Sequence, residues 1–264
     1  MIVCGCDLGS ATGKAVILKD DKILSWAVTN STRSPEITAQ TVLNDALEKA
    51  GLSISDVEYV VGTGYGRAGV SFIQDNMSEI TCHARGAHWS YPDARMIVDI
   101  GGQDCKVITL SNQGKVLEFS MNDKCAAGTG RFFEAMTRAL DCTIDELSEL
   151  ALASDNPVNI TKQCSVFAES EVVTLINTGV DAKDIAAGIH DSIARRIHSM
   201  AYKMGIKPDV VMTGGCARNK ALTKYLEIHL GVEIKDLSIN PQIAGALGAA
   251  LFARDRALKK AANA

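Results

Sequence analysis

The sequence predicts an α/β protein made of two related domains, and three observations support this prediction. One pattern of strand, turn, strand, turn and strand occurs at residues 1–30 and again at 94–122. Amphipathic helical patterns occupy most of the remaining chain. The length of 264 residues is large for one hydrophobic core and comfortable for two small ones.

The two copies of the hairpin carry the same residue types at the same spacing. An apolar strand ends in an aspartate, a glycine follows two residues later, and a lysine opens the next strand seven residues after the aspartate. Because an internal repeat marks a duplicated structural unit, we expect two similar domains that face each other. The repeated residues are Asp7, Gly9 and Lys14 in the first copy, and Asp99, Gly101 and Lys106 in the second.

Capping residues and hydrophobic periodicity predict the other elements. The expected helices run from Ser34-Pro35 to Gly51, from the Thr143–Glu146 capping box onward, over about 181–204, and over 242–262. Residues 209–215 (DVVMTGG) predict a buried strand that runs into a glycine turn.

The composition is that of an ordinary globular protein, with 47% hydrophobic and 22% charged residues. A net charge of −4 lacks the basic surplus typical of nucleic-acid-binding proteins. No apolar run is long enough to span a membrane, and Asp7 within the first apolar run argues against a secretory signal. We therefore expect a cytoplasmic protein with no nucleic-acid or membrane partner.

Three glycine-rich turns follow predicted strands, at residues 7–14, 99–106 and 213–219. Glycine lets the backbone approach a phosphate and turn its N–H groups toward it, whereas a single such turn fits a plain hairpin equally well. Asp7 and Asp99 at the strand ends suit a hydrated Mg²⁺, which proteins hold with one or two carboxylates and the nucleotide phosphates. Three turns, two of them duplicated, favour a nucleotide site.

Two familiar nucleotide motifs do not fit. A phosphate-binding loop of the form GxxxxGK[ST] fails, because Ala15 follows Gly13-Lys14 and Leu8 stands where the first glycine belongs. Residues 62–67 (GTGYGR) read GxGxG and lack the spacing and context of a dinucleotide-binding GxGxxG.

The paired hairpins resemble the actin-like ATPase superfamily, which includes acetate and sugar kinases. This resemblance implies two ribonuclease-H-like domains with the nucleotide in a cleft between them. The implied domains are residues 1–93 and 94–242, with a C-terminal helix over about 243–264 that packs back on the first.

By position, the resemblance also implies roles for individual residues. Asp7, Asp99, Gln103 and Asp104 are the expected catalytic residues, and Asp104 beside Gln103 could orient the attacking water or the metal. Phosphoryl transfer depends mostly on such positioning and charge stabilisation. The expected nucleotide-binding residues are Ser10, Ala11, Thr12, Gly13, Lys14, Gly101, Gly102, Gln103, Gly128, Gly130, Gly214, Gly215, Ala217 and Gln242.

A narrower resemblance covers nearly the whole chain. The segments TGYGR, SEITCHARG, DIGGQDCKV, MNDKCAAGTGRF, CSVFAESEV, AGIH and MTGGCARN resemble the activator ATPases of 2-hydroxyacyl-CoA dehydratases and related double-cubane cluster reductases, component A of the BadF/BadG/BcrA/BcrD family. That family implies a homodimer with one shared [4Fe–4S] cluster, whose ligands match Cys125 and Cys164. It also implies ATP, ADP and Mg²⁺ as cofactors, ferredoxin or flavodoxin as electron donor, and an iron–sulfur dehydratase or reductase as electron acceptor.

The chemistry of the cysteines agrees with this implication. The chain has eight cysteines and no CxxC pair. Cys125 and Cys164 stand in glycine-flanked or polar turns ahead of predicted helices, whose N-termini favour thiolates. Two from each of two chains make the four thiolates of a cubane cluster. The alternative for Cys125 is a free thiol that caps a helix.

The remaining candidates are structural or open. Cys4 and Cys6 lie on one side of the first strand and predict core packing. Cys82, next to His83, is expected to be structural, and Cys105, Cys142 and Cys216 are expected to be inert. Glu169 and Glu171 fit either a functional role or ordinary polar helix positions.

Three functions remain open from the residues. The first is an ATP-driven one-electron donor to a 2-hydroxyacyl-CoA dehydratase, a double-cubane cluster protein or a benzoyl-CoA-type reductase. The second is a small-molecule kinase of the same superfamily, such as an amino-sugar kinase. A third is a nucleotide sensor without catalysis. The absorption spectrum of anaerobically purified protein separates the first from the other two.

Overall fold

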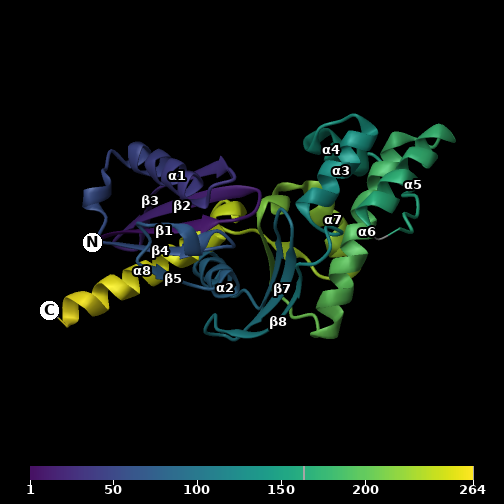
Figure 1. Ribbon diagram of the computed structural model, residues 1–264. Helices are drawn as coiled ribbons and strands as arrows, with labels where there is room; N and C mark the ends of the chain where they lie inside the picture. Colours follow the sequence, from purple (N-terminus) through teal and green to yellow (C-terminus); the bar gives the residue numbers. More distant parts are fainter. Residues whose placement is uncertain (163, 264) are drawn as a thin grey trace. The chain divides into compact units, whose positions relative to one another are not determined.

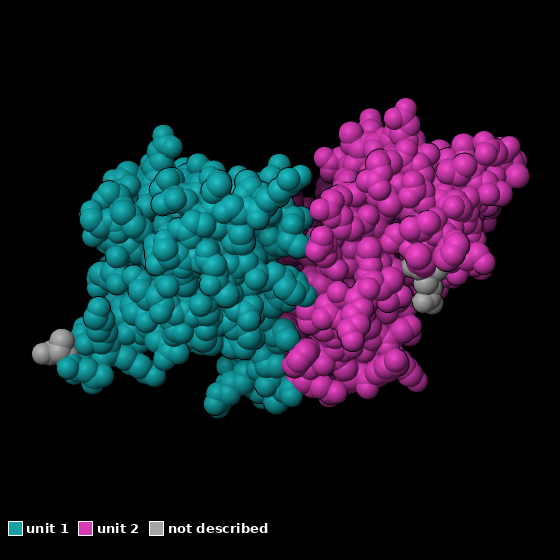
Figure 2. Space-filling model, viewed as in Figure 1, with its two compact units in different colours: residues 1–94, 110–117, 236–264 teal, residues 95–109, 118–235 magenta. Residues whose placement is uncertain are grey.

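A computed structural model describes residues 1–162 and 164–263. The chain forms two compact units, coloured separately in Figure 2. Unit 1 comprises residues 1–94, 110–117 and 236–264, and unit 2 comprises residues 95–109 and 118–235. Within the described residues, none of the helices combines the length and apolar character needed to cross a bilayer.

Unit 1 contains a five-stranded sheet in the order β3-β2-β1-β4-β5 (Figure 1). The first three strands form the predicted antiparallel hairpins, and β4 and β5 are added in parallel to β1. The strands are β1 (Ile2–Leu8), β2 (Thr12–Lys19), β3 (Lys22–Asn30), β4 (Tyr59–Thr63) and β5 (Asp75–Asn76).

Alternation along β1 gives the sheet of unit 1 two apolar faces. Cys4 and Cys6 pack in the cluster that contains the buried residues of α1 (Pro35–Ala50). Val3 points to the opposite cluster, which contains α8 (Ala244–Ala262). The sheet therefore lies between α1 and α8, while α2 (Glu79–Ser90) packs against α8.

Helix α8 meets its neighbours through glycines. A Cβ at Gly5 of β1 would clash with the backbone of α8, and so would one at Gly86 of α2. Conversely, a Cβ at Gly248 of α8 would clash with the backbone of α2. Helix α8 therefore contacts both β1 and α2 backbone to backbone.

Unit 2 repeats the sheet plan, with five strands in the order β10-β9-β6-β7-β8. The second predicted hairpin is β6-β7, with β8 at the sheet edge, and β9 pairs in parallel with β6. The strands are β6 (Met96–Ile100), β7 (Cys105–Leu110), β8 (Val116–Asn122), β9 (Val210–Thr213) and β10 (Ile234–Lys235).

The helices of unit 2 share one large core with the sheet, centred on Phe132, Phe133 and the buried face of α6. The predicted capping box of Thr143 and Glu146 starts α4, and Asp181 caps α6. The helices are α3 (Gly130–Leu140), α4 (Ile144–Leu152), α5 (Ser165–Asn177), α6 (Ala182–Lys203) and α7 (Lys220–Leu230).

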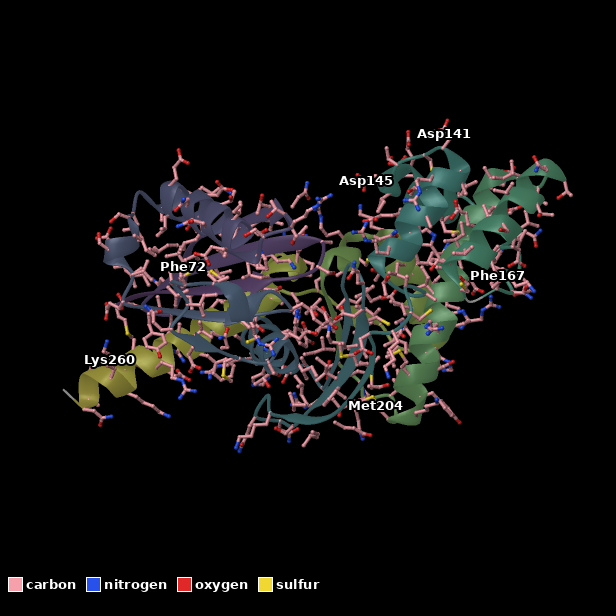
Figure 3. The ribbon with its side chains drawn as sticks, in the orientation of Figure 1. Phe72, Asp141, Asp145, Phe167, Met204 and Lys260 are labelled. Carbon is pink, nitrogen blue, oxygen red and sulfur yellow. The ribbon has the colours of Figure 1, made fainter. Side chains whose placement is uncertain are left out.

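Short 3₁₀ turns complete the chain, and two of them carry residues of interest. They are η1 (Ile54–Asp56), η2 (Arg67–Gly69), η3 (Gly215–Arg218) and η4 (Pro241–Ile243). Figure 3 shows the side chains on this framework, with Phe167 labelled near the start of α5.

Candidate functional site

The first aspartate–lysine pair lies at the end of β1 in unit 1. Asp7 and Lys14 are opposite each other in the antiparallel β1–β2 pair, and Lys14 Nζ lies 3.3 Å from Asp7 Oδ2. The intervening turn is closed by the Gly9 amide, which donates to the Thr12 carbonyl at 3.1 Å. Ser31 Oγ donates to the Gly9 carbonyl at 2.7 Å and fixes the same turn from β3's end.

The second pair lies at the end of β6 in unit 2 and is more deeply buried. Lys106 is 2% exposed, and its Nζ lies 3.2 Å from Asp99 Oδ2 and 2.9 Å from Asp104 Oδ2. Thr213 Oγ1 donates to Asp99 Oδ1 at 2.8 Å. One ammonium therefore faces two carboxylates at this point.

A threonine and a glycine from a neighbouring parallel strand lie beside each aspartate–lysine pair, and we call each such group of residues a half-site. Thr63 of β4 is in register with Asp7, and Thr213 of β9 is in register with Asp99. The glycines that follow, Gly64 and Gly214, adopt φ values of 82° and 86°. A Cβ would lie 2.6 Å from Asp7 Oδ1 at Gly64, and 3.0 Å from Asp99 Oδ1 at Gly214. Both turns are therefore folded directly over a carboxylate, where only glycine fits.

The Thr63–Gly64 turn is the residue pair that sequence reasoning missed. The sequence TG occurs at both 63–64 and 213–214, but residues 62–67 match an incomplete dinucleotide motif and resemble a segment that connects the two domains. Comparing the residues after β4 and β9 could have found it, because both strands pair in parallel with the strand that carries the aspartate.

Other predicted nucleotide-binding residues fall into two groups, one in each unit. In unit 1, the β1–β2 turn and the start of β2 hold Ser10, Ala11, Thr12 and Gly13, and η4 holds Gln242. In unit 2, the β6–β7 turn holds Gly101, Gly102 and Gln103, the start of α3 and the turn before it hold Gly130 and Gly128, and the segment after β9 holds Gly214, Gly215 and Ala217.

The two half-sites have the groups that phosphate and Mg²⁺ require. Asp99 and Asp104 offer carboxylate oxygens, which are the protein ligands that Mg²⁺ prefers. Lys14 offers a point charge for a phosphate. The glycines of both turns keep side chains away from the backbone amides, which is how proteins build anion-binding turns.

The β6–β7 turn is hydrogen-bonded directly to the first turn of α3. The amide of Gly130 donates to the Gly101 carbonyl at 2.9 Å, and the amide of Arg131 donates to the Gly102 carbonyl at 2.9 Å. The first N–H groups of a helix have no partner within the helix. Here the glycine turn supplies these partners, so the turn and the helix start are one connected piece.

Cys125 lies in the loop between β8 and α3. Asn122, the last residue of β8, donates from Nδ2 to the Cys125 carbonyl at 2.8 Å and to the Ala127 carbonyl at 3.2 Å. The sequence predicts a small-residue turn after Cys125 and then a helix, and α3 begins at Gly130 with Thr129 as its N-cap. Residues 126–129 form the turn, which is closed by the Thr129 amide on the Ala126 carbonyl at 3.1 Å, with Gly128 at φ 84°.

Cys164 occupies the N-cap position of α5 and is exposed. The two residues after Ser165, Val166 and Phe167, are 67% and 63% exposed, although both are large and apolar. Helices α3 and α5, which follow the two cysteines in the chain, pack against each other.

The other cysteines include four buried thiols, whereas Cys142 and Cys216 are half-buried, as Cys125 is. Cys4, Cys6, Cys82 and Cys105 are fully buried. Burial raises the pKa of Cys82 to about 12 and that of Cys105 to about 11. Burial also raises the pKa of the Cys216 thiol to about 12, and it raises the pKa of Cys142. A thiol with a raised pKa is a poor metal ligand at neutral pH, because the thiolate is the binding form.

Glu171 and Glu169 separate in the structure. The Glu171 carboxylate accepts hydrogen bonds from the amides of Thr161 and Lys162 and from the Thr161 hydroxyl, in the segment just before Cys164. Glu169 is a partly exposed position of α5. From the sequence, both residues fit either a functional role or an ordinary helix position. In the structure, Glu171 makes specific contacts with the segment before Cys164, whereas Glu169 occupies a partly exposed helix position.

Duplicated sheets, each with an aspartate–lysine pair under a threonine–glycine turn, give the chain the fold of the actin-like ATPases and sugar kinases, as predicted. The ROK hexokinase of Thermus thermophilus shares this fold at a TM-score of 0.53 and 17% identity, over 98% of this chain and 100% of that one.

Residues 4–253 match the BadF/BadG/BcrA/BcrD ATPase family, and the chain belongs to this family. It is 45% identical over 262 residues to the activator of lactoyl-CoA dehydratase of Anaerotignum propionicum, covering 98% of this chain and 100% of the relative. It is 36% identical to a benzoyl-CoA reductase subunit of Thauera aromatica, covering 95% and 92% of the two chains.

A solved structure extends the similarity to three dimensions. The activator of the 2-hydroxyisocaproyl-CoA dehydratase from Clostridium difficile, solved with bound ADPNP, superposes with a TM-score of 0.94 at 40% identity. The match covers 100% of this chain and 98% of that one. The family predicted from the sequence is thereby confirmed.

Proposed function

We propose that this protein is an ATP-hydrolysing activator, which works as a homodimer with one shared [4Fe–4S] cluster. It delivers a low-potential electron to an iron–sulfur enzyme of the 2-hydroxyacyl-CoA dehydratase type or to a double-cubane cluster protein. Family membership and the dehydratase activators among its relatives support the activator role.

The observation that carries the proposal is the hydrogen-bonded link between the β6–β7 turn and the start of α3. Gly101 and Gly102 belong to the Asp99 half-site, which we assign to Mg-ATP. Gly130 and Arg131 begin the helix that follows the Cys125 loop. A protein that couples ATP to electron transfer needs such a connection, because the effect of a nucleotide must reach the cluster.

The residues of one chain fit half of a cubane cluster. Such a cluster takes four thiolates, and no group of three or more His, Cys, Asp or Glu suited to a metal occurs within residues 1–162 and 164–263. Cys125 and Cys164 of two chains supply four thiols. Exposed Val166 and Phe167 beside Cys164 give each chain an apolar surface that a second copy would cover.

A bound cluster supplies a one-electron centre, and the chain's own groups do the rest. Asn122 holds the Cys125 loop by two carbonyl groups. Cys164 stands at the N-terminus of α5, where the partial positive charge of the helix favours a thiolate. Asp7, Asp99, Gln103 and Asp104 would place Mg²⁺, water and phosphates for hydrolysis, which requires positioning and charge stabilisation rather than a nucleophile.

ATP hydrolysis would let this protein carry out a transfer that an electron carrier without ATP cannot. A reduced ferredoxin or flavodoxin would charge the cluster, and ATP would then drive the electron onto a partner that the donor alone cannot reduce. For a one-electron couple, 59 mV corresponds to a tenfold change in the equilibrium.

Two alternatives keep specific support. An ATPase subunit of a benzoyl-CoA-type reductase is consistent with the similarity to the Thauera aromatica benzoyl-CoA reductase. A small-molecule kinase, such as an amino-sugar kinase, is consistent with the fold it shares with a hexokinase.

Anaerobic purification tests the proposal. The protein should be brown, lose its colour in air and contain about four irons per dimer. Replacing Cys125 or Cys164 by serine should remove the iron, whereas Cys142→Ser, a matched control at a half-buried thiol, should retain it. A colourless protein that phosphorylates amino sugars would instead establish the kinase alternative.

A further inference from the structure

The segment 159–162 leads to Cys164 and has no regular secondary structure. Thr161 and Lys162 are exposed, and only Ile160 is buried in the core. A cavity of about 300 Å³ lies between this segment, residues Ala127 and Gly128, and one face of α6. Apolar packing therefore does not hold the outer part of the segment, and polar contacts have to fix it.

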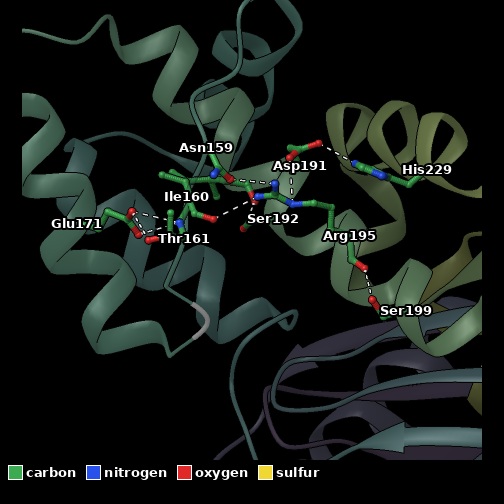
Figure 4. Close-up of polar contacts among 10 residues, drawn as sticks. Asn159, Ile160, Thr161, Glu171, Asp191, Ser192, Arg195, Ser199 and His229 are labelled. Carbon is green, nitrogen blue, oxygen red and sulfur yellow. Dashed lines mark hydrogen bonds and ion pairs between the residues drawn. The ribbon is translucent and has the colours of Figure 1, made fainter.

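Glu171 holds the end of the segment nearest the cysteine (Figure 4). Its carboxylate accepts from the Thr161 amide at 3.0 Å, from the Thr161 hydroxyl at 2.8 Å and from the Lys162 amide at 2.9 Å. Partial burial opposes its ionisation, but these donors outweigh that effect and hold the pKa of Glu171 below its ordinary value. The ionised form, which bonds most strongly to amides, is therefore the form present at neutral pH.

Glu171 is placed for this contact by the helix that Cys164 begins. Seven residues separate the two positions, which is about two turns of an α-helix, so both lie on one side of α5. The chain before Cys164 thus runs back along the helix that follows it, and Glu171 ties the two together.

Arg195 of α6 holds the other end of the segment. Its guanidinium donates to Asn159 Oδ1 at 2.9 Å and to the Ile160 carbonyl at 3.2 Å. The same group is oriented from behind by Asp191, whose Oδ2 lies 3.3 Å from Arg195 Nε and whose Oδ1 lies 2.7 Å from His229 Nε2 (Figure 4). Because Asp191 holds the third nitrogen of the planar guanidinium, Nε, the group has little rotational freedom. Its contacts with residues 159 and 160 are therefore well directed.

We propose that Glu171 and Arg195 are positioning residues for the Cys164 thiolate, and that together they fix the segment 159–162 from two helices. This role rests on the proposed function, since it presumes that Cys164 is a cluster ligand. Glu171 fixes the segment to α5 and Arg195 fixes it to α6, so the ligand keeps its place relative to the rest of unit 2. The cavity beside the segment is the space into which it would otherwise move.

Two conservative variants and one matched control test the proposal. Glu171→Gln removes the charge and one acceptor, and Arg195→Lys removes the fork but keeps the charge. Glu169→Gln makes the same chemical change two residues earlier on α5 and serves as the control. In iron-free protein, we expect hydrogen exchange of the Thr161 and Lys162 amides to become about tenfold faster in Glu171→Gln and to stay unchanged in Glu169→Gln.

The second measurement is made on protein loaded anaerobically with iron. Transfer of iron to a chelator should be about tenfold faster in Glu171→Gln and in Arg195→Lys than in the wild type, and faster still in the double variant. The electron paramagnetic resonance spectrum of the reduced protein should change in both variants, because the ligand geometry changes. The urea midpoint of the iron-free proteins should stay at the wild-type value.

The outcomes distinguish this inference from the proposed function. A wild-type protein that takes up no iron overturns both. Loaded wild type with unchanged iron release and an unchanged spectrum in Glu171→Gln and Arg195→Lys overturns the positioning role alone. A fall in the urea midpoint that accounts for the faster iron release also overturns it, because the residues would then be ordinary supports of the fold.

Discussion

The amide of Gly130 donates a hydrogen bond of 2.9 Å to the carbonyl of Gly101, so a helix start and a glycine turn share one contact. Gly101 belongs to the half-site of Asp99, and Gly130 opens the helix after Cys125. A nucleotide can change the cluster only if it binds two conformations with different affinity. In the proposed activator this contact gives such a difference a short route, and by linkage, reduction of the cluster would change nucleotide affinity by the same factor.

We therefore expect the ATP, ADP and nucleotide-free states to differ in the rate of iron loss to a chelator and in midpoint potential. Gln103→Ala and Asp104→Ala should reduce the difference while the cluster still assembles, because they alter the turn and leave the cysteines untouched. Chelation time courses and redox titrations measure both quantities. Coincidence of the three nucleotide states in both assays would reduce the cluster to a passive electron store or a dimer staple.

Removing the charge of either strand-end aspartate should abolish hydrolysis. We expect Asp7→Asn and Asp99→Asn to lower Mg-ATP turnover by at least about 100-fold, because positioned charges dominate phosphoryl transfer. Iron content should remain at the wild-type level, since the cysteines lie on other segments. Phosphate release and iron analysis on the same preparations check this, and retained turnover in Asp99→Asn would remove Asp99 from the active site.

The buried ammonium of Lys106 should be essential for stability. It forms ion pairs with Asp99 and Asp104, and Lys106→Met would remove both of these contacts from buried carboxylates. We expect a loss of about 3–5 kcal/mol in the free energy of unfolding, measured by urea titration. The exposed Lys115→Met is the control and should stay within about 0.5 kcal/mol of the wild type.

Gly214 should tolerate no side chain, for two separable reasons. Its φ of 86° disfavours any other residue, and a Cβ would in addition clash with the Ile100 carbonyl. Gly179 has a φ of 80°, and a Cβ there would meet nothing within 4 Å, so Gly179→Ala measures the backbone cost alone, about 1–2 kcal/mol. Gly214→Ala should cost more in urea titration and should also lower ATP turnover. Equal losses in the two variants would argue against a close contact at Gly214.

His190 should make stability depend on pH. It is fully buried on α6, and its Nδ1–H donates to the Ala186 carbonyl at 2.7 Å, so Nε2 accepts from Asn219 Nδ2 at 3.0 Å. Burial lowers the pKa of His190 from 6.5 to about 4, although both hydrogen bonds act in the opposite direction.

The sign of the effect follows from which state takes up the proton. Above about pH 6.5 neither state is charged at this residue, whereas between pH 6.5 and 4 the unfolded chain binds a proton that the folded chain refuses. The free energy of unfolding should therefore fall by about 3 kcal/mol across this range. Urea titrations at several pH values should show a shallower slope for His190→Gln than for the wild type. Parallel curves for His190→Gln and wild type would show that His190 titrates normally.

Local chemistry explains what the sequence could predict. The strand-end aspartates, the lysines seven residues later and the caps at Ser34 and Thr143 are set by near neighbours in the chain, and the structure places them as expected. The resemblance to the family predicts Cys125 and Cys164 as cluster ligands, because their positions before helices alone do not distinguish ligands from free thiols.

Long-range pairing explains what the sequence could not predict. Thr63 and Asp7 meet only because β4 lies beside β1, and no spacing along the chain reveals that register. The sequence left Glu171 open between a functional role and an ordinary helix position, since its partners lie in an irregular segment whose path depends on α6 as well. The second carboxylate of Lys106 likewise became visible only when the β6–β7 turn was folded.

The glycine contacts of α8 have a consequence for how this chain can vary. At Gly5, Gly86 and Gly248, main chain faces main chain, so even a single methyl group would have to push a helix off its sheet or off its neighbour. Most of unit 1 can exchange residues of similar size through many small steps. These three positions allow no such gradual exchange, so we expect glycine to stay at each of them in any sequence that keeps this fold.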